Sequence, residues 1–351
     1  MNRVMVDFHH HDLYESLAIL FEDRLGWQLF RPIGLDWFAQ EYWNFERKVH
    51  GDAVARQYLT PWGDDIPGDA WSLRADRSHP GRYHKLVTVE QARALGLDLV
   101  VASVDHNHEG FHRFATENGA TFGIHLGNVR WNDTQDRWDL ADLALVSTKL
   151  PFVPSVPFAI VRQEFSLDDF HPGPPPRDEP FVVASFVNCF AENAPAYAHF
   201  REAAGMAPEY DWRAYGSYGS APEDEYAAGN IGRCADVAAA MRATDVAWHT
   251  KRWSDGYGHV IHNLFAVGRP VLGIASYYAD QLAGPLWIEG VTSFDIEHLS
   301  PPETLALVER LHRDEELHLR MCADAAARFR EVVDFRAEAA DVERLLARVL
   351  P

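Results

Sequence analysis

The segment "RWSDGYGHVIHNLFAVGRPVLG", residues 252–273, carries the strongest fold signal in this sequence. It follows a short apolar stretch, 245–251, and we expect a strand there, then a glycine-rich turn, a helix and the buried strand "RPVLGI". Gly256 and Gly258 allow the backbone to approach a ligand closely where the helix begins. The N–H groups of a first helical turn favour an anion, and Lys251 and Arg252 could add charge-assisted bonds to it. The segment therefore predicts a phosphate-binding turn, although a turn that needs glycine only for packing has the same pattern.

Strand and helix signals alternate along the chain on both sides of this segment. In the first half, the expected strands are 3–8, 27–33, 97–104, 120–127, 143–148 and 156–165, and the expected helices are 12–26, 89–96 and 109–119. The alternation restarts with "FVVASFV" at 181–187 and ends in a long amphipathic run from residue 301. Such alternation predicts parallel sheets with helices on both faces, which bind ligands at the carboxyl ends of their strands.

A proline-rich stretch, "SLDDFHPGPPPRDEP" at 166–180, separates the two alternating regions. Proline stiffens the backbone and removes hydrogen-bond donors, so we interpret this stretch as a linker. The expected domains are 1–165, with a Trp-rich insertion at about 35–85, and 181–334. A helix at 335–351 ends the chain.

The composition narrows the classes of partner. The 351 residues include 52 acidic and 32 basic side chains, a net charge of −20, which disfavours nucleic acid and anionic membranes. Nucleic acid stays open only if a basic patch gathers Arg74, Arg77, Arg82, Lys85 and Arg130. No apolar run reaches the roughly 18 residues of a membrane span. "MNRVMVDFHHHD" lacks the apolar stretch of a signal peptide, and the three cysteines are far apart, so we expect a cytoplasmic protein.

Residues 236–345 resemble the C-terminal domain of GT-B glycosyltransferases, in the large retaining family that includes sucrose and glycogen synthases. The family motif runs acid–Gly–Phe–Gly, four variable positions, then Glu–Ala–x–Ala–x–Gly–x–Pro–Val. The sequence matches it without a gap as Asp255–Gly256–Tyr257–Gly258, four positions, and Asn263 through Val271. The resemblance implies an α/β GT-B fold, with two Rossmann-like parallel-sheet domains facing each other across a cleft. It also implies sugar transfer, with retention, from a nucleotide-diphosphate-sugar donor to an acceptor hydroxyl, with no obligatory cofactor or metal.

The resemblance assigns residues to the donor. Asp255 would contact the donor sugar, and Asn263 would hold the ribose hydroxyls. The backbone around Gly256, Tyr257, Gly258, His259 and Val260 would face the diphosphate, and Gly216 and Ser217 would lie against the base. Both acids of the motif are altered, one to Asp255 and one to Asn263. The basic residues that the family places after the first two strands of this domain are missing from "SFVNCFAEN" and "AYGSYGS". Lys251 and Arg252 could compensate, or could be a solvated pair on a loop.

Histidines follow the expected strands of the first domain, which the resemblance assigns to the acceptor. His10 follows the first strand, Asp105 follows the strand at 97–104, and His125 ends the next strand, where the family has a histidine that faces the cleft. An imidazole can orient or deprotonate an acceptor hydroxyl near neutral pH, with Asp105 as an orienting group. The clusters "HHHD" and "DHNH" leave a metal-dependent hydrolase as an alternative. Ordinary surface or core histidines remain a third reading.

The acceptor stays open among glycans, small molecules, proteins and modified DNA bases. A sugar-nucleotide epimerase or hydrolase of the same fold, or a non-catalytic nucleotide- or glycan-binding relative, remains an alternative. The Trp-rich insertion could stack on sugars or bases, or form an ordinary satellite core. The resemblance also implies that the terminal helix packs back on the first domain.

Overall fold

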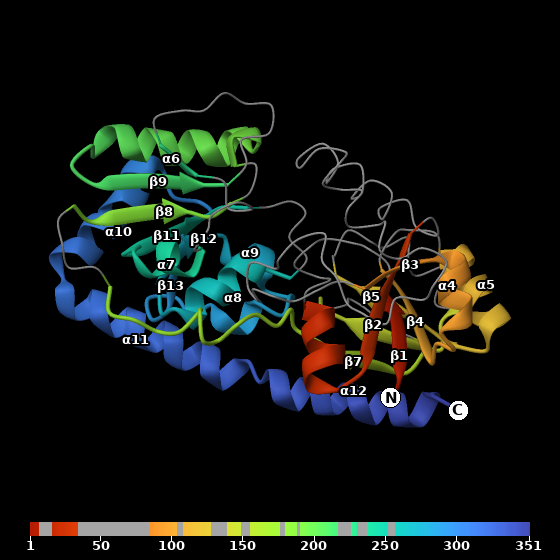
Figure 1. The fold of residues 1–351 in the computed structure, drawn as a ribbon. Coiled ribbons are helices and arrows are strands. Elements are labelled where there is room, and N and C mark those ends of the chain that lie inside the picture. Colours follow the sequence, from red (N-terminus) through yellow and green to blue (C-terminus); the bar gives the residue numbers. More distant parts are fainter. Residues whose placement is uncertain are drawn as a thin grey trace. The chain divides into compact units, whose positions relative to one another are not determined.

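The computed structural model describes residues 1–6, 16–33, 85–103, 108–127, 139–148, 155–175, 180–187, 190–216, 226–229, 237–251 and 257–351. The chain divides into two compact units. Unit 1 comprises Met1–Phe165 and Phe335–Pro351, and unit 2 comprises Ser166–Asp334. Each unit is built around its own parallel sheet (Figure 1).

The sheet of unit 1 has seven strands in the order β3-β2-β1-β4-β5-β6-β7. Their bounds are β1 Arg3–Val6, β2 Gln28–Ile33, β3 Lys85–Thr88, β4 Leu99–Ser103, β5 Thr121–Leu126, β6 Leu143–Val146 and β7 Phe158–Ile160. All neighbouring pairs are parallel, and β5 pairs with β4 from Leu99↔Thr121 to Ser103↔His125. The described strands in the middle of the sheet are apolar on both faces, which is the pattern of a strand covered by helices on each side.

Helices cover both faces of the unit 1 sheet (Figure 1). The helices are η1 Ile19–Arg24, a π-helical segment, with α4 Val89–Ala94, α5 His108–Asn118 and α12 Phe335–Val349. Phe111 and Phe114 of α5 pack with Met5 and Val100 in one core cluster. Residues of η1 and α12 form the second cluster with the opposite face of the sheet.

The C-terminal helix α12 is joined to unit 1 by polar contacts as well as by its apolar face. Glu338 accepts a hydrogen bond from the backbone N–H of Arg162 at 2.7 Å, and it forms an ion pair with the Arg162 guanidinium. The ring of Phe335 packs edge-on against Phe165 at 5.5 Å. A segment distant in sequence therefore completes the core of unit 1.

The sheet of unit 2 has six strands in the order β10-β9-β8-β11-β12-β13, again all parallel. Their bounds are β8 Val182–Ser185, β9 Asp211–Tyr215, β10 Ala227–Gly229, β11 Val246–His249, β12 Val271–Gly273 and β13 Ser293–Asp295. The chain moves from β8 outward to β10 and then crosses to β11 on the other side of β8. This reversal of direction creates a topological switch point between β8 and β11.

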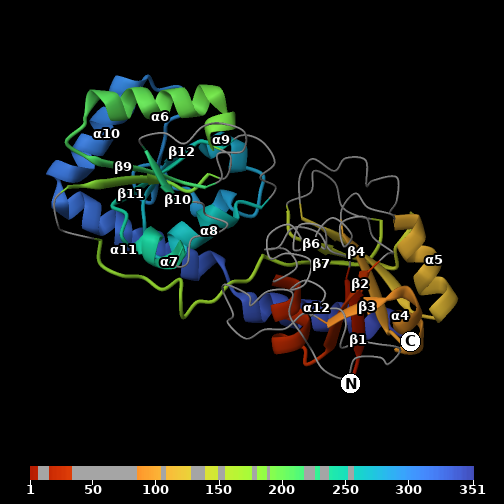
Figure 2. The same ribbon diagram turned by 45° about the horizontal axis from the view of Figure 1, so that its top comes forward.

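Helices also cover both faces of the unit 2 sheet. They are η4 Phe190–Glu192, α6 Ala194–Met206, α7 Val237–Arg242, α8 His259–Ala266, α9 Ala275–Tyr278, η6 Gly284–Leu286, α10 Pro301–Arg313 and α11 Glu315–Val332. Figure 2 shows α6 and α10 on one side of this sheet and α7 and α8 on the other. The helix ends follow local rules: Ser300 and Glu303 form a capping box at α10, and Asp314 caps α11 by accepting from the Leu317 N–H at 2.9 Å.

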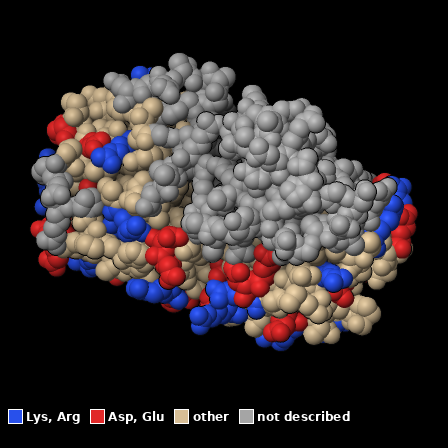
Figure 3. Space-filling view, in the orientation of Figure 1, with Lys and Arg blue, Asp and Glu red and all other residues tan. Residues whose placement is uncertain are grey.

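The surface of α11 and α12 carries charges of both signs. Basic and acidic side chains are interspersed there (Figure 3). Pairs one turn apart include Arg320 with Glu316 and Arg328 with Glu331. Such exposed pairs each stabilise a helix by only about 0.3–0.5 kcal/mol, so the apolar faces hold these helices in place.

One strand is much shorter than the sequence-based expectation, and two more were not predicted. The strand expected at 156–165 extends only over Phe158–Ile160, because Pro157 supplies no N–H and the chain leaves the sheet after Ile160. The edge strands β3 and β10 are absent from the prediction, since "AAG" has no strand propensity of its own. The Trp-rich insertion lies outside the described residues apart from Lys85.

Residues 166–175, expected to be part of a linker, belong to unit 2 and are held by one buried cation. The guanidinium of Arg269 is fully buried and donates to Gly173 O at 2.9 Å and to Pro174 O at 3.0 Å. It also donates to Arg242 O at 2.6 Å, and burial lowers its pKa. Arg269 therefore fastens this segment to the turn before β12.

Candidate functional site

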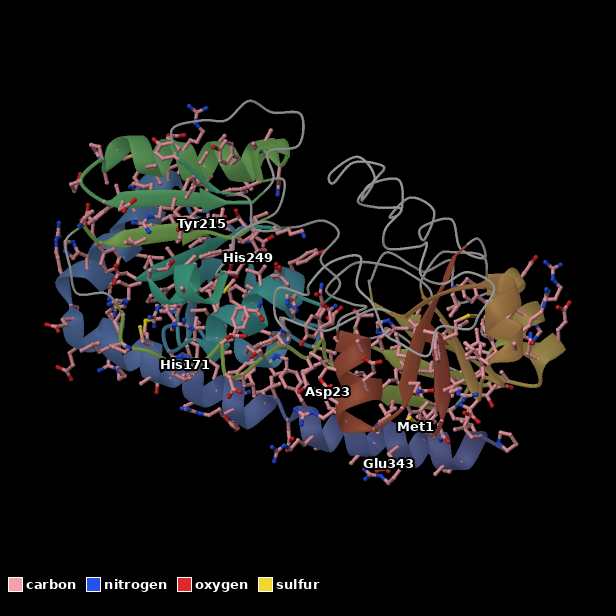
Figure 4. All side chains as sticks on the ribbon, in the orientation of Figure 1. Met1, Asp23, His171, Tyr215, His249 and Glu343 are labelled. Carbon is pink, nitrogen blue, oxygen red and sulfur yellow. The ribbon has the colours of Figure 1, made fainter. Side chains whose placement is uncertain are left out.

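The first candidate site lies at the switch point of the unit 2 sheet. Open parallel sheets bind ligands outside the carboxyl ends of the strands, where neighbouring connections run to opposite faces. Figure 4 labels Tyr215 and His249, the last residues of β9 and β11. They lie at the C-terminal ends of the strands, which we call the carboxyl edge of the sheet. The side chain of Asn193, just before α6, reaches across this edge and lies 3.4 Å from Thr250 O. The loops after β8 and β11 therefore meet at one place.

The helix that follows β11 begins at this edge with a left-handed residue. Gly258 precedes α8 with φ = 79°, and a Cβ at this position would lie 2.9 Å from Ala283 Cβ and 3.1 Å from Tyr278 Cε1. Both the backbone angle and the space therefore require glycine. The first turn of α8 contains no acidic side chain. Backbone N–H groups at such a helix start, together with the helix dipole, favour an anion.

Two hydrogen bonds to one carbonyl and a ring stack fix the start of α8. The Gly258 carbonyl accepts from the His262 N–H at 3.0 Å and from His262 Nδ1 at 2.9 Å. A carbonyl only accepts, so Nδ1 of His262 carries a hydrogen. The same ring stacks on Tyr257, with 4.2 Å between centroids and 12° between planes. The motif residues Tyr257 and Gly258 are thus held by a side chain one turn into the helix.

Two buried polar atoms at this edge have no hydrogen-bond partner among the described residues. They are Oδ1 of Asn263, in α8, and Oγ1 of Thr250, directly after β11. Both side chains belong to residues that are 4% exposed. Buried polar atoms are nearly always hydrogen-bonded, and an amide oxygen in this state can accept from a ligand hydroxyl. Asn263 is the residue that the family resemblance assigns to the ribose.

The remaining described donor-site residues lie at the same edge. Lys251 is partly exposed and follows Thr250 directly, and His259 and Val260 open α8. Gly216 follows β9 with φ = 138°. Tyr215 beside it stacks on Phe186, which follows β8, at 4.9 Å and 5°. The structure therefore brings Gly216, Lys251, Gly258 and Asn263 to one edge of one sheet.

Sequence reasoning missed the aromatic support behind Gly258. The hydroxyl of Tyr278 lies 2.8 Å from His249 Nε2, and the Tyr278 ring stacks on Trp287 at 5.6 Å and 13°. Gly273 permits this packing, because a Cβ there would lie 2.4 Å from His249 O and 2.7 Å from the Trp287 ring. The glycine after "RPVL" was the only sequence signal for this close approach.

The second candidate site belongs to unit 1 and contains His125. This residue lies in β5, is fully buried, and its Nε2 is 2.7 Å from Ser147 Oγ. Burial lowers the pKa of His125 to about 4, so the ring is neutral near pH 7. The family resemblance predicts that this side chain faces the interdomain cleft; in the structure it is fully buried near the C-terminal end of β5.

Several expected site residues lie outside the described residues. They are His10, Asp105, Asp255, Arg252, Gly256 and Ser217, together with Arg74, Arg77, Arg82 and Arg130 of the suggested basic patch. Within the described ranges, no group of three or more His, Cys, Asp or Glu side chains could hold a metal ion. The stretch 9–12 and residues 105–106 are not covered by that observation. In the same described part of the chain, no helix is long and apolar enough to cross a membrane.

Comparison with solved structures identifies the fold. HepE from Anabaena, in a complex with UDP and glucose, matches with a TM-score of 0.65 and 13% identity, covering 99% of each chain. Sucrose-phosphate synthase from Thermosynechococcus elongatus matches with a TM-score of 0.62 and 13% identity, again over 99% of each chain. A glycosyltransferase from Rickettsia africae matches with a TM-score of 0.65 and 8% identity, covering 99% of this chain and 98% of the other. By sequence, no family model and no curated protein matches.

These matches confirm the expected α/β architecture: the chain has the GT-B fold, with one Rossmann-like parallel sheet in each unit. Identities of 8–13% establish the fold and leave the chemistry to the residues of the site.

Proposed function

We propose that this protein is a glycosyltransferase that takes a sugar from a nucleotide-diphosphate donor bound by unit 2. The observation that carries the proposal is that α8 starts at the switch point. One turn into this helix, the buried Oδ1 of Asn263 has no hydrogen-bond partner among the described residues. The helix start suits the diphosphate, and the amide oxygen suits a ribose hydroxyl. HepE, a structure of the same fold, is described in complexes with UDP and with UDP-glucose, which supports UDP as the donor nucleotide.

In the proposed reaction, the bond between the sugar and the diphosphate breaks and a bond to an acceptor oxygen forms. Negative charge develops on the leaving diphosphate, and the first-turn N–H groups of α8 with Lys251 and Arg252 would stabilise it. Asp255 would hold the sugar hydroxyls. The proton of the acceptor hydroxyl would pass to a base, for which His10 is a candidate in unit 1. Retention of the anomeric configuration is part of the proposal and rests on the motif at 255–271.

The first experiment measures nucleotide binding by calorimetry, with UDP, GDP, ADP, CDP and TDP, each with and without a divalent cation. The expected result is selective binding of one diphosphate, UDP, without added metal. Asn263→Ala should weaken that binding by about twofold to twelvefold, because one hydrogen bond contributes about 0.5–1.5 kcal/mol. The matched control is Asn118→Ala, whose side-chain amide donates within α5 to Phe114 O at 2.6 Å, and which should bind UDP as the wild type does.

The second experiment follows UDP-glucose by NMR, with and without a panel of hydroxyl acceptors. Glucosylated product that forms only with an acceptor, with the anomeric configuration of the donor, supports the proposal. Loss of UDP-glucose without any acceptor would identify a hydrolase or an epimerase of the same fold. Binding without turnover over the whole panel would identify a nucleotide-binding protein. Unchanged transfer by Asp255→Ala would remove the assigned role of that residue.

A further inference from the structure

The strand β7 ends the sheet of unit 1, and its outer side has no neighbouring strand among the described residues. On its inner side, Pro157 O and the Val161 N–H each bond to β6 at 2.9 Å. Alternate residues of a strand point their backbone N–H and C=O groups to opposite sides. The backbone groups of Phe158 and Ile160 therefore point outward, away from the sheet.

This outer edge is blocked at one end and apolar along the rest. Glu338 of α12 accepts from the Arg162 N–H at 2.7 Å, so that residue is closed to strand pairing. The side chains of Phe158 and Ile160 are 37% and 43% exposed, and they lie on the face of β7 opposite to Ala159, which packs with α12. Exposed edge strands are commonly protected by a charge or a cover. The exposed apolar pair instead suits a strand that takes a partner.

The helix α12 runs in the direction opposite to β7. Its first residue, Phe335, contacts Phe165, which follows the strand. Three residues later, Glu338 contacts Arg162. Later residues of the helix therefore lie beside earlier residues of the strand.

The groove between β7 and α12 has a volume of about 630 Å³ and carries charges of both signs. Its lining includes Phe158, Ile160, Asp341, Arg344 and Arg348. Because the two elements run in opposite directions, Asp341 lies nearer Ile160 and Arg348 lies nearer Phe158. Arg344, between the other two charges, forms an ion pair with Asp341. An acid and a base thus mark opposite ends of the open edge.

We propose that two copies of this chain associate through β7, about a two-fold axis beside Ala159, and join their unit 1 sheets into one. Antiparallel pairing places Phe158 opposite the partner's Ile160, and the outward N–H and C=O groups of both residues bond across the axis. The same axis places Asp341 beside the partner's Arg348. One symmetry operation therefore satisfies the backbone groups, the apolar side chains and the charges together, which favours a second copy over an unrelated peptide.

The first test measures the mass of the full chain by sedimentation at about 0.1–100 µM. The wild type should have twice the mass of one chain and should dissociate on dilution. Ile160→Lys places a charge on the pairing edge and, because of the symmetry, removes two apolar contacts at once. It should raise the dissociation constant of the dimer at least about tenfold.

The matched control is Met206→Lys, which changes a side chain that is 48% exposed in unit 2 and should leave the dimer unchanged. Urea unfolding of both variants checks that the fold is kept. A wild type that stays monomeric over the whole concentration range would overturn the proposal. A dimer that persists unchanged in Ile160→Lys would show that another surface is used.

Charge reversal tests the register without touching the strand. Arg348→Asp and Asp341→Arg each place like charges opposite one another on both sides of the axis, and each should raise the dissociation constant about threefold or more. The double variant Asp341→Arg/Arg348→Asp restores opposite charges and should recover most of the wild-type affinity. It also gives Arg344 a new acidic neighbour one turn away. A double variant no tighter than either single variant would refute the two-fold arrangement.

This association does not rest on the proposed function, and UDP binding separates the two. Unit 2 holds the proposed donor site, so Ile160→Lys should bind UDP as the wild type does. If UDP binding fails while the dimer behaves as expected, the proposed function fails alone. If a monomeric wild type instead carries a different polypeptide that Ile160→Lys releases, the second copy is refuted and β7 is a docking strand for another protein.

Discussion

Replacing Gly258 by alanine tests whether the start of α8 is shaped by the backbone alone or also by its surroundings. The residue has φ = 79°, a conformation in which an L-residue costs about 1–2 kcal/mol. The new methyl group would lie 2.9 Å from Ala283 Cβ and 3.1 Å from the Tyr278 ring, and overpacking of this kind costs about 1–3 kcal/mol. Gly258→Ala should therefore lower the free energy of unfolding by about 2–5 kcal/mol, the sum of the two.

Two other glycines of unit 2 separate these contributions. Gly290 has φ = 69° with no atom within 4 Å of an added Cβ, so Gly290→Ala should lose only the backbone part, about 1–2 kcal/mol. Gly205, near the end of α6, has neither a positive φ nor a neighbour within 4 Å. Gly205→Ala should be neutral, or stabilise the helix by up to about 1 kcal/mol.

Urea unfolding followed by tryptophan fluorescence measures all three variants. Trp212 and Trp248 are buried in the core of unit 2 and report on it. The expected order of stability is Gly205→Ala, then Gly290→Ala, then Gly258→Ala. A Gly258→Ala protein as stable as Gly290→Ala would refute the packing argument. UDP affinity measured on the folded variants should fall for Gly258→Ala alone, because the first turn of α8 must move.

Three further predictions concern stability. The pKa of His125 is about 4 in the folded protein and about 6.5 in the unfolded chain, so the unfolded chain binds an extra proton between these pH values. Lowering the pH from 6.5 to 4 should therefore reduce the free energy of unfolding by roughly 3 kcal/mol. In His125→Gln the free energy of unfolding should change less over this pH range, and an equal change would contradict the assignment. Glu338→Ala leaves the Arg162 side chain, which is 13% exposed, without its carboxylate partner. The free energy of unfolding should fall by about 2–4 kcal/mol, and amide hydrogen exchange in α12 should become faster. Tyr278→Phe keeps the ring stack but removes the bond to His249, and should cost about 1–3 kcal/mol in urea unfolding; no loss would show that this bond is weak.

The fold follows from patterns that the sequence displays locally. Alternating strands and helices predict parallel sheets, and the apolar runs mark the central strands such as β4 and β11 because both of their faces are covered. Edge strands carry less of this signal, and β10, with the sequence Ala227–Gly229, takes its conformation from pairing with β9. Gly258 was identified from its motif, and its positive φ is the physical reason why a glycine is needed there.

Residues that depend on packing could not be predicted. Arg269 belongs to a motif position where a charged side chain suggests solvent, yet it is fully buried because backbone carbonyls from three segments converge on it. Ser147 follows an apolar strand like many other serines, and only the register of β5 with β6 brings it to His125. Tyr278 is an aromatic residue in a run of two, and nothing in that run predicts its hydroxyl bond to His249.

The return of α12 to unit 1 has a consequence for how the protein folds during its synthesis. Val342, Leu345 and Leu346 belong to the core cluster that contains Val4 and Val6 of the first strand. Those first strands leave the ribosome early, but they cannot complete this core until residues 335–351 have been translated. Unit 2 is a single continuous segment, Ser166–Asp334, and needs no later residue. Nascent chains usually fold from the N-terminus onward. Here unit 2 can reach its native state first. Unit 1 emerges earlier but keeps apolar surface exposed, where chaperones can bind it, until α12 has been synthesised.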